Sequence, residues 1–241
     1  MKDETMNMLQ RHFFRAMLLT LALLLGGPTG SATAESLEEQ VTGIERYYAS
    51  LGSLRFHFEQ LSHSGGSQRL GKGSGVLFKD RSGDGGKVRG MMRWDYQEPE
   101  PQVIVSDGET IAVYSPADRQ MLVSSAAALE TDILYRLFLR EQDQLADFNV
   151  AWSPSEQVGT VGELRKLRLE PRLPHPQIRE VTLWFDAAYR IQRLRMLDQF
   201  GGETSLLLDQ MRENPLAGNS PEQIRAIFQL TPPEGTEIIR N

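Results

Sequence analysis

Residues 91–114 read MMRWDYQEPEPQVIVSDGETIAVY, and this stretch carries the clearest strand signals of the sequence. It contains most of three runs that favour β-strands, Val88–Tyr96, Gln102–Ser106 and Thr110–Ser115. The second and third runs are joined by the turn pair Asp107-Gly108. Short strands connected by tight turns are typical of an antiparallel meander. The stretch therefore predicts consecutive strands of one antiparallel sheet.

Strand patterns continue on both sides of this block. Leu54, Phe56 and Phe58 alternate with polar residues, which is the period of two expected for a strand with one buried face. Further strand-like runs are Ser74–Lys79, Gln120–Ser124, Asn149–Ser153, Glu163–Glu170, Glu180–Phe185, Ile191–Leu197, Thr204–Met211 and a last one, Ala226–Leu230.

Helical patterns interrupt the strands at three places. Ser36-Leu37-Glu38-Glu39 reads as a capping box, and the apolar stripe behind it predicts a helix that runs to about Ser50. Ala126–Phe148 predicts a second amphipathic helix with a shorter companion at Glu141–Ala146, and Ser220–Ile224 predicts a turn of helix.

The expected fold class is mainly β (α+β): about ten or eleven strands with two or three helices. Apolar sheet faces must be covered, and few helices are available to cover them, so we expect the sheet to curl into a half-open antiparallel barrel. Val103-Ile104-Val105 and its neighbours are apolar on both faces. Such strands indicate either ordinary core packing or a barrel interior that leaves a hydrophobic cavity.

Residues typical of catalysis or metal binding are sparse. His57, His63 and His175 are scattered, and the chain has no cysteine. Gly71–Gly75 resembles a phosphate loop, but another strand follows it instead of a helix, so we interpret it as glycines in a twisted or bulged strand. We therefore expect no enzyme, no metal and no cofactor.

The first 34 residues have the layout of a secretory signal peptide. Arg11 and Arg15 precede the apolar run Ala16–Leu25, and Ala32-Thr33-Ala34 offers a cleavage site after Ala34. The run is shorter than the roughly 20 residues that span a bilayer. We expect residues 1–34 to be removed and residues 35–241 to form the working domain. Because no cysteine follows the cut, that domain should be released and not lipidated.

The net charge is acidic, at −6, and basic residues form no cluster. This balance argues against nucleic acid as a partner and against docking on anionic lipid headgroups.

Residues 92–116, which read MRWDYQEPEPQVIVSDGETIAVYSP, resemble the outer-membrane lipoprotein carrier family, the LolA-like periplasmic chaperones. Leu54–Gln60 and Phe228–Thr236 agree with the same family in the right order. The resemblance implies a half-open barrel with a helical lid over a hydrophobic cavity. It also implies a monomeric periplasmic carrier that takes acylated lipoproteins from an inner-membrane ABC transporter and delivers them to an outer-membrane lipoprotein acceptor.

The resemblance also suggests site residues. Seven match positions of the barrel lining and three would form the apolar face of the lid: Phe56, Phe58, Trp94, Tyr96, Val103, Val105 and Tyr114, then Leu134, Leu137 and Phe138. The family carries an arginine that latches the lid. Arg81 is the nearest match, although a glycine-rich insertion follows it and Arg89 or Arg93 could serve instead.

Two other functions fit the same pattern. The scaffold could carry a different lipid, such as a glycolipid or a pigment-linked acyl chain. It could also be a regulatory module that senses mislocalised lipoproteins and binds a membrane protein.

Overall fold

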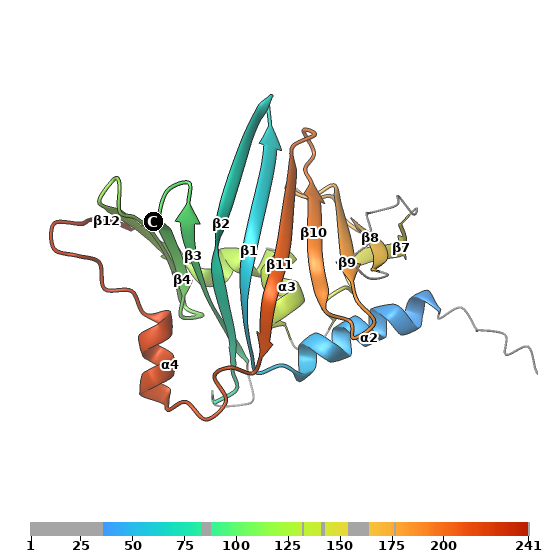
Figure 1. Ribbon diagram of the computed structural model, residues 1–241, viewed down its shortest axis with the longest axis horizontal. Coiled ribbons are helices and arrows are strands. Elements are labelled where there is room, and N and C mark those ends of the chain that lie inside the picture. The colour runs from blue at the N-terminus through green and yellow to red at the C-terminus, as the bar shows by residue number, and fades with distance from the viewer. Residues whose placement is uncertain are drawn as a thin grey trace, which may run out of the picture. The chain divides into compact units, whose positions relative to one another are not determined.

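Twelve strands form one open sheet, with the order β12-β6-β5-β4-β3-β2-β1-β11-β10-β9-β8-β7 (Figure 1). The structure, a computed structural model, describes residues 36–82, 88–131, 133–140, 143–153, 164–175 and 177–240. The predicted signal peptide lies outside these residues and stays a prediction. The strands are β1 Ser53–Ser64, β2 Ser67–Asp80, β3 Arg89–Glu98, β4 Gln102–Ser106, β5 Thr110–Ser115, β6 Gln120–Ser125, β7 Phe148–Trp152, β8 Arg165–Pro171, β9 Glu180–Phe185, β10 Ile191–Leu197, β11 Glu203–Glu213 and β12 Glu237–Arg240.

The predicted antiparallel sheet with a few helices is confirmed, with two differences. The sheet has twelve strands instead of ten or eleven; as expected it stays open, because its terminal strands β12 and β7 do not pair with each other. Strand β12 runs parallel to β6, whereas the other neighbours pair antiparallel. Strand β1 lies between β2 and β11, so the two halves of the sheet meet at the first strand of the chain.

The first predicted helix is confirmed as α2, Leu37–Ser50. Its capping box is complete, because the hydroxyl of Ser36 accepts from the backbone N–H of Glu39 at 3.1 Å and the Glu39 carboxylate accepts from the Ser36 N–H at 2.7 Å. The second predicted helix is divided into a 3-10 helix, η2 Ala126–Thr131, and the short α-helix α3, Ile133–Leu139. Its predicted companion is not a helix, since residues 144–147 form a turn and residues 141–142 lie outside the described chain.

The predicted last strand, Ala226–Leu230, is wrong. Residues 221–228 form helix α4, Pro221–Phe228, which a second capping box between Ser220 and Gln223 starts. Ile224 and Phe228, one turn apart on this helix, are both buried. The actual last strand is β12.

Helices cover both faces of the sheet around β2–β4. The inner face packs with α2 and α3 in the main core, which includes the alternating residues Leu54, Phe56 and Phe58 of β1. On the opposite, outer face a second cluster joins Val76, Met91 and Val105 to Ile224 and Phe228 of α4. Because both faces are covered here, the strands within residues 91–114 are apolar on both faces and do not alternate between apolar and polar residues.

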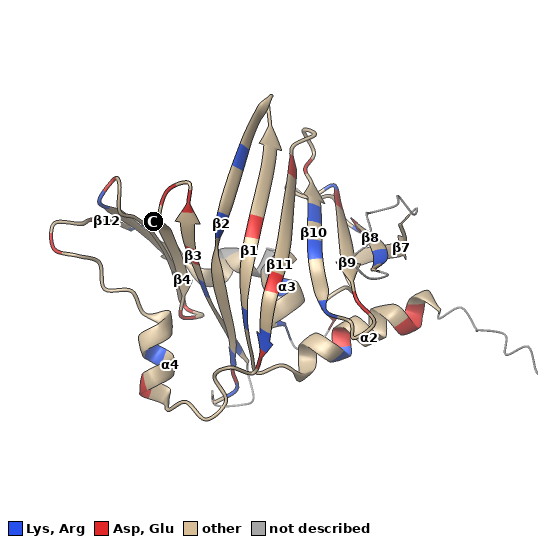
Figure 2. Cartoon of the chain, in the orientation of Figure 1, with Lys and Arg blue, Asp and Glu red and all other residues tan. Residues whose placement is uncertain are grey.

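The outer face of β8–β10 is covered differently. Charges of both signs are spread along the strands (Figure 2), and in the register Arg193 and Arg195 of β10 lie opposite Trp184 and Thr182 of β9. Arg193 and Arg195 lie over the ring of Trp184, with guanidinium carbons 4.8 and 5.9 Å from its centroid, and the Lys166 ammonium lies 5.4 Å from it. The aliphatic stems of these long cations therefore shield the indole, which is only 4% exposed, without a helix.

Candidate functional site

A cavity of about 240 Å³ lies between the inner face of β2–β5 and the helices η2 and α3. The sheet forms one wall, and the helices form the other. The ten lining residues are mostly aliphatic or aromatic: Gln60, Leu77, Met92, Trp94, Tyr96, Ile104 and Ile111 from the strands, then Leu129, Tyr135 and Phe138 from the helices. Hydrocarbon walls with few polar groups favour an apolar ligand.

Aromatic rings support the wall of this cavity in edge-to-face pairs. The ring centroids of Phe56 and Trp94 lie 5.1 Å apart, and Phe58 lies 4.9 Å from both Trp94 and Tyr96. Phe138 of α3 reaches down to Phe56, at 6.5 Å between ring centroids. These contacts hold the lining rings in fixed orientations and join the short helix to the sheet.

Glycines on β2 make room for the rings. Gly71, Gly73 and Gly75 alternate along the strand and so face the inner side, where they lie opposite Gln60, Phe58 and Phe56 of β1. A methyl group added at Gly75 would fall within the Phe56 ring, and one added at Gly73 would meet Phe58 and the backbone of Asp95. The interpretation of these glycines as part of a twisted or bulged strand is confirmed, because the β2–β3 register shifts between Lys72 and Gly73.

The structure brings together most of the predicted acyl-binding residues. Trp94, Tyr96 and Phe138 line the cavity. Phe56, Phe58 and Leu137 are fully or almost fully buried in the core behind it. Leu134 lies in α3, but its side chain is outside the described ones.

The expectation that Val103, Val105 and Tyr114 face the cavity is wrong. Val103 and Val105 pack in the second cluster on the outer face, and Tyr114 lies opposite Val103 in the β4–β5 register. Adjacent strand residues point to opposite faces, so Ile104 is the β4 residue that lines the cavity. Sequence reasoning also missed Met92 and Ile111, although both follow from the register with Trp94 and Ile104.

The three candidate latch arginines have different surroundings. Arg89 pairs with Glu109 at 3.1 Å, while Arg93 pairs with Asp95 at 2.8 Å and donates to the Ile227 carbonyl of α4 at 3.1 Å. Arg81 instead donates to the carbonyl oxygen of Ala49 at 3.1 Å, at the C-terminal end of α2. The latch role of Arg81 remains a prediction.

The described residues that line the cavity include no acidic, basic or histidine side chain. Within the described ranges, no three histidine, cysteine, aspartate or glutamate side chains are placed to hold a metal ion. In the part of the chain described, no helix is both long and apolar enough to cross a bilayer.

An open sheet, antiparallel except at β12, with an apolar cavity under a short helix is an arrangement suited to binding an apolar ligand. The chain belongs to the family described as outer membrane lipoprotein carrier protein LolA, whose model matches residues 49–220. The predicted family resemblance is confirmed.

Similar proteins agree with this membership. The chain is 29% identical to the outer-membrane lipoprotein carrier protein of Alkalilimnicola ehrlichii over 93% of its own length and 94% of that protein. It is 25% identical to the protein of the same name from Methylobacillus flagellatus, over 83% and 88% of the two chains. Among solved structures, an uncharacterized conserved protein from Thermus thermophilus shares the fold, with a TM-score of 0.51, 12% identity and coverage of 86% and 100%. The family and its named members support a role as a lipoprotein carrier.

Proposed function

We propose that this protein carries lipoproteins through the periplasm with their acyl chains enclosed between α3 and the inner face of β2–β5. It would receive them from an inner-membrane ABC transporter and pass them to an outer-membrane acceptor. The observation that carries the proposal is the cavity itself, whose wall consists of rings and aliphatic side chains such as Trp94, Ile104 and Phe138.

An acylated protein needs such an enclosure. Each CH₂ group that leaves an apolar phase for water costs about 0.8 kcal/mol, so a long acyl chain does not cross an aqueous compartment unaided. The carrier must also release its cargo, and a binding site that is covered by a displaceable element can do both.

Helix α3 has the properties of a displaceable cover. It is seven residues long, whereas an isolated helix shorter than about 12 residues is marginal in water. Its stability therefore depends on the apolar contacts of Leu137 and Phe138 with the core. The cavity of about 240 Å³ is smaller than the roughly 300–1,000 Å³ of most ligand pockets, so α3 would move outward when acyl chains enter and exchange its contacts for theirs.

Filling the cavity tests the proposal. Ile104→Trp places an indole inside it, while Leu207→Trp adds the same group on β11, at a residue that is 46% exposed and absent from the lining. We expect Ile104→Trp to lose most of the release of an acylated lipoprotein from inner-membrane vesicles in vitro and Leu207→Trp to retain it. Equal release by both variants, with both folded, would contradict an acyl-chain site in this cavity. Mass spectrometry of ligand co-purified from the periplasm should find acylated polypeptide, and free lipid alone would favour a carrier of other lipids.

A further inference from the structure

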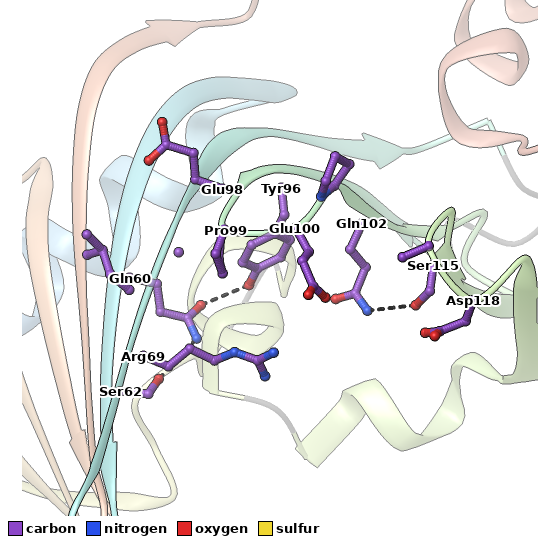
Figure 3. A pocket seen from close by; sticks show the side chains of 14 residues that line it. Gln60, Ser62, Arg69, Tyr96, Glu98, Pro99, Glu100, Gln102, Ser115 and Asp118 are labelled. Atoms are coloured by element: carbon purple, nitrogen blue, oxygen red, sulfur yellow. Dashed lines mark hydrogen bonds between the residues drawn. The ribbon is translucent and has the colours of Figure 1, made fainter.

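A second, polar recess of about 190 Å³ lies next to the cavity, where β1–β5 approach the β3–β4 and β5–β6 turns (Figure 3). The polar groups of its wall include the side-chain amides of Gln60 and Gln102, the hydroxyls of Ser62 and Ser115, and the guanidinium of Arg69. Apart from Gln60, these residues do not line the apolar cavity.

The recess and the cavity share a boundary. Gln60 and Tyr96 line both, and the Tyr96 hydroxyl donates to Oε1 of Gln60 at 2.8 Å. On β4, Gln102 lies opposite Tyr96 just as Ile104 lies opposite Trp94, so the polar and apolar residues occupy the same face of the sheet. The inner face therefore changes from hydrocarbon to hydrogen-bonding groups at the Tyr96–Gln60 pair.

The recess presents donors. Among the described residues, the amide nitrogen of Gln102 donates one hydrogen bond, to Ser115 at 3.3 Å, and that of Gln60 donates one, to Ser62 at 3.3 Å. Each NH₂ group has two N–H bonds, so each keeps one for a ligand. Arg69 makes no ion pair with another described residue, and its guanidinium extends across the recess in Figure 3. These N–H groups are suited to donating hydrogen bonds to the carbonyl oxygens of a ligand.

The rim of the recess is acidic. Glu98, Glu100 and Asp118 contribute three carboxylates to the lining against the single guanidinium of Arg69. The Glu98 carboxylate points away from the other labelled side chains in Figure 3, and its charge also acts on Lys72, so Glu100 and Asp118 contribute most to the acidic rim. Like charges repel, so the rim disfavours an anionic group even though the donors of the recess would accept it.

We infer that this recess binds the uncharged ester or amide linker at the polar end of an acyl chain and selects against an anionic headgroup. The hydrocarbon part lies in the cavity beyond Tyr96, so the inference rests on the proposed function. It names the cargo chemistry that the site prefers: an acyl chain joined to a neutral carbonyl group, and not a free fatty acid or an acidic phospholipid.

Two ligands with one chain length test the inference. N-dodecanoyl glycinamide is uncharged, and dodecanoate carries a carboxylate. Both are titrated at low ionic strength against the neutral apolar dye N-phenyl-1-naphthylamine bound to the full-length mature protein. We expect the amide to bind about tenfold more tightly than the carboxylate.

Neutralising the rim with Glu98→Gln, Glu100→Gln and Asp118→Asn should reduce that preference to about twofold, because dodecanoate gains affinity. A control with a matched charge change, Glu38→Gln, Glu222→Gln and Glu234→Gln, alters exposed carboxylates elsewhere and should keep the wild-type ratio. Gln102→Leu should weaken the amide about fivefold relative to wild type, with the dye affinity of the variant measured directly for the competition.

The outcomes separate the two proposals. If the protein binds both ligands but the rim variant keeps the wild-type ratio, or Gln102→Leu binds the amide normally, the recess has no selective role and the acyl-chain cavity stands. If the wild type binds neither the dye nor either ligand, the proposed function fails and the inference fails with it.

Discussion

The ammonium nitrogen of Lys79 lies 2.6 Å from the carbonyl oxygen of Tyr48, so the end of β2 is tied to the last turn of α2. Lys79 is only 4% exposed, and its backbone N–H also donates to the carbonyl of Gly52 at 2.9 Å. The last carbonyls of a helix lack partners within it and carry partial negative charge, which a cation stabilises. Two residues further along, Arg81 serves the same helix end from the surface, through the carbonyl of Ala49.

Replacement of Lys79 by methionine should destabilise the protein. Lys79→Met keeps the apolar stem but removes a buried charged hydrogen bond, for an expected loss of about 1.5–3 kcal/mol in the free energy of unfolding. Arg81→Met is the control, because exposed cations contribute about 0–1 kcal/mol. Urea denaturation measures both. A larger loss for Arg81→Met would show that the surface arginine, and not the buried lysine, holds the helix end.

Two neighbouring tyrosines give a matched pair of hydroxyl deletions. The Tyr48 hydroxyl accepts the backbone N–H of Ile191 at 2.8 Å inside the core, and burial raises the pKa of this phenol. Tyr48→Phe leaves that N–H without a partner, at a cost of about 1–3 kcal/mol. Tyr47 donates to the exposed carboxylate of Glu213, so Tyr47→Phe should cost less than about 1 kcal/mol. Thermal unfolding would contradict this account if the two variants lost equal stability.

The glycines of β2 predict a graded effect of added methyl groups. Gly75→Ala forces its Cβ into the Phe56 ring and should cost about 1–3 kcal/mol or more. Gly71→Ala brings Cβ to 3.3 Å from the Tyr96 ring, which needs only a small adjustment. Denaturant midpoints should therefore fall clearly for Gly75→Ala and little for Gly71→Ala. The reverse order would mean that Phe56 can swing away, and the ring positions would not depend on the glycines.

Asp186 gives the protein a pH-dependent contribution to stability. Its carboxylate accepts the N–H groups of Ala188 and Arg190 at 2.9 and 3.0 Å and pairs with the Arg190 side chain at 2.8 Å. Burial raises its pKa, but these hydrogen bonds and the Arg190 charge outweigh burial and lower the pKa below the usual value. Because the folded-state pKa is the lower one, the stabilisation is present above about pH 4 and disappears as the pH falls through the folded-state pKa.

Asp186→Asn should therefore lose about 1–2 kcal/mol at pH 7 and less at pH 3. Urea unfolding of wild type and variant at both pH values gives the two differences. A difference of the same size at pH 3 and pH 7 would show that the charge of Asp186 does not contribute.

Local patterns were sufficient for most of the sheet. Gln102–Ser106 and Thr110–Ser115 were predicted with their observed bounds, and the capping box at Ser36 located the start of α2. Both signals arise from contacts within a few residues, which sequence displays directly. The last strand failed because an apolar run as short as Ala226–Leu230 suits either a strand or a buried helix face. The capping box at Ser220, with Pro221 next to it, was the signal that could have decided between them.

The directions in which the side chains of β4 point could not be predicted from the sequence, because they depend on the register between strands. Val103, Ile104 and Val105 are all apolar, so no alternation marks the cavity side. Ile104 faces it because it pairs with Trp94, while the α4 helix covers its neighbours from the other side. The location of α4 depends on contacts between residues more than 100 positions apart, such as that between Arg93 and the Ile227 carbonyl. The polar recess also depends on contacts between distant residues, because its lining comes from five strands. No single segment of the sequence therefore predicts it.

The open sheet has a consequence for self-association. An unpaired strand edge offers backbone N–H and C=O groups to another copy of the chain, and this is a common start of aggregation. At one end of the order, β12 covers β6 with only four residues, and Glu237 and Arg240 place a charge at each of its ends. So short and charged an edge is a poor template for a further strand. Because β12 pairs with β6, the edge of β6 is not available to a strand of another copy. This pairing would limit edge-to-edge polymerisation of a carrier whose sheet is not closed.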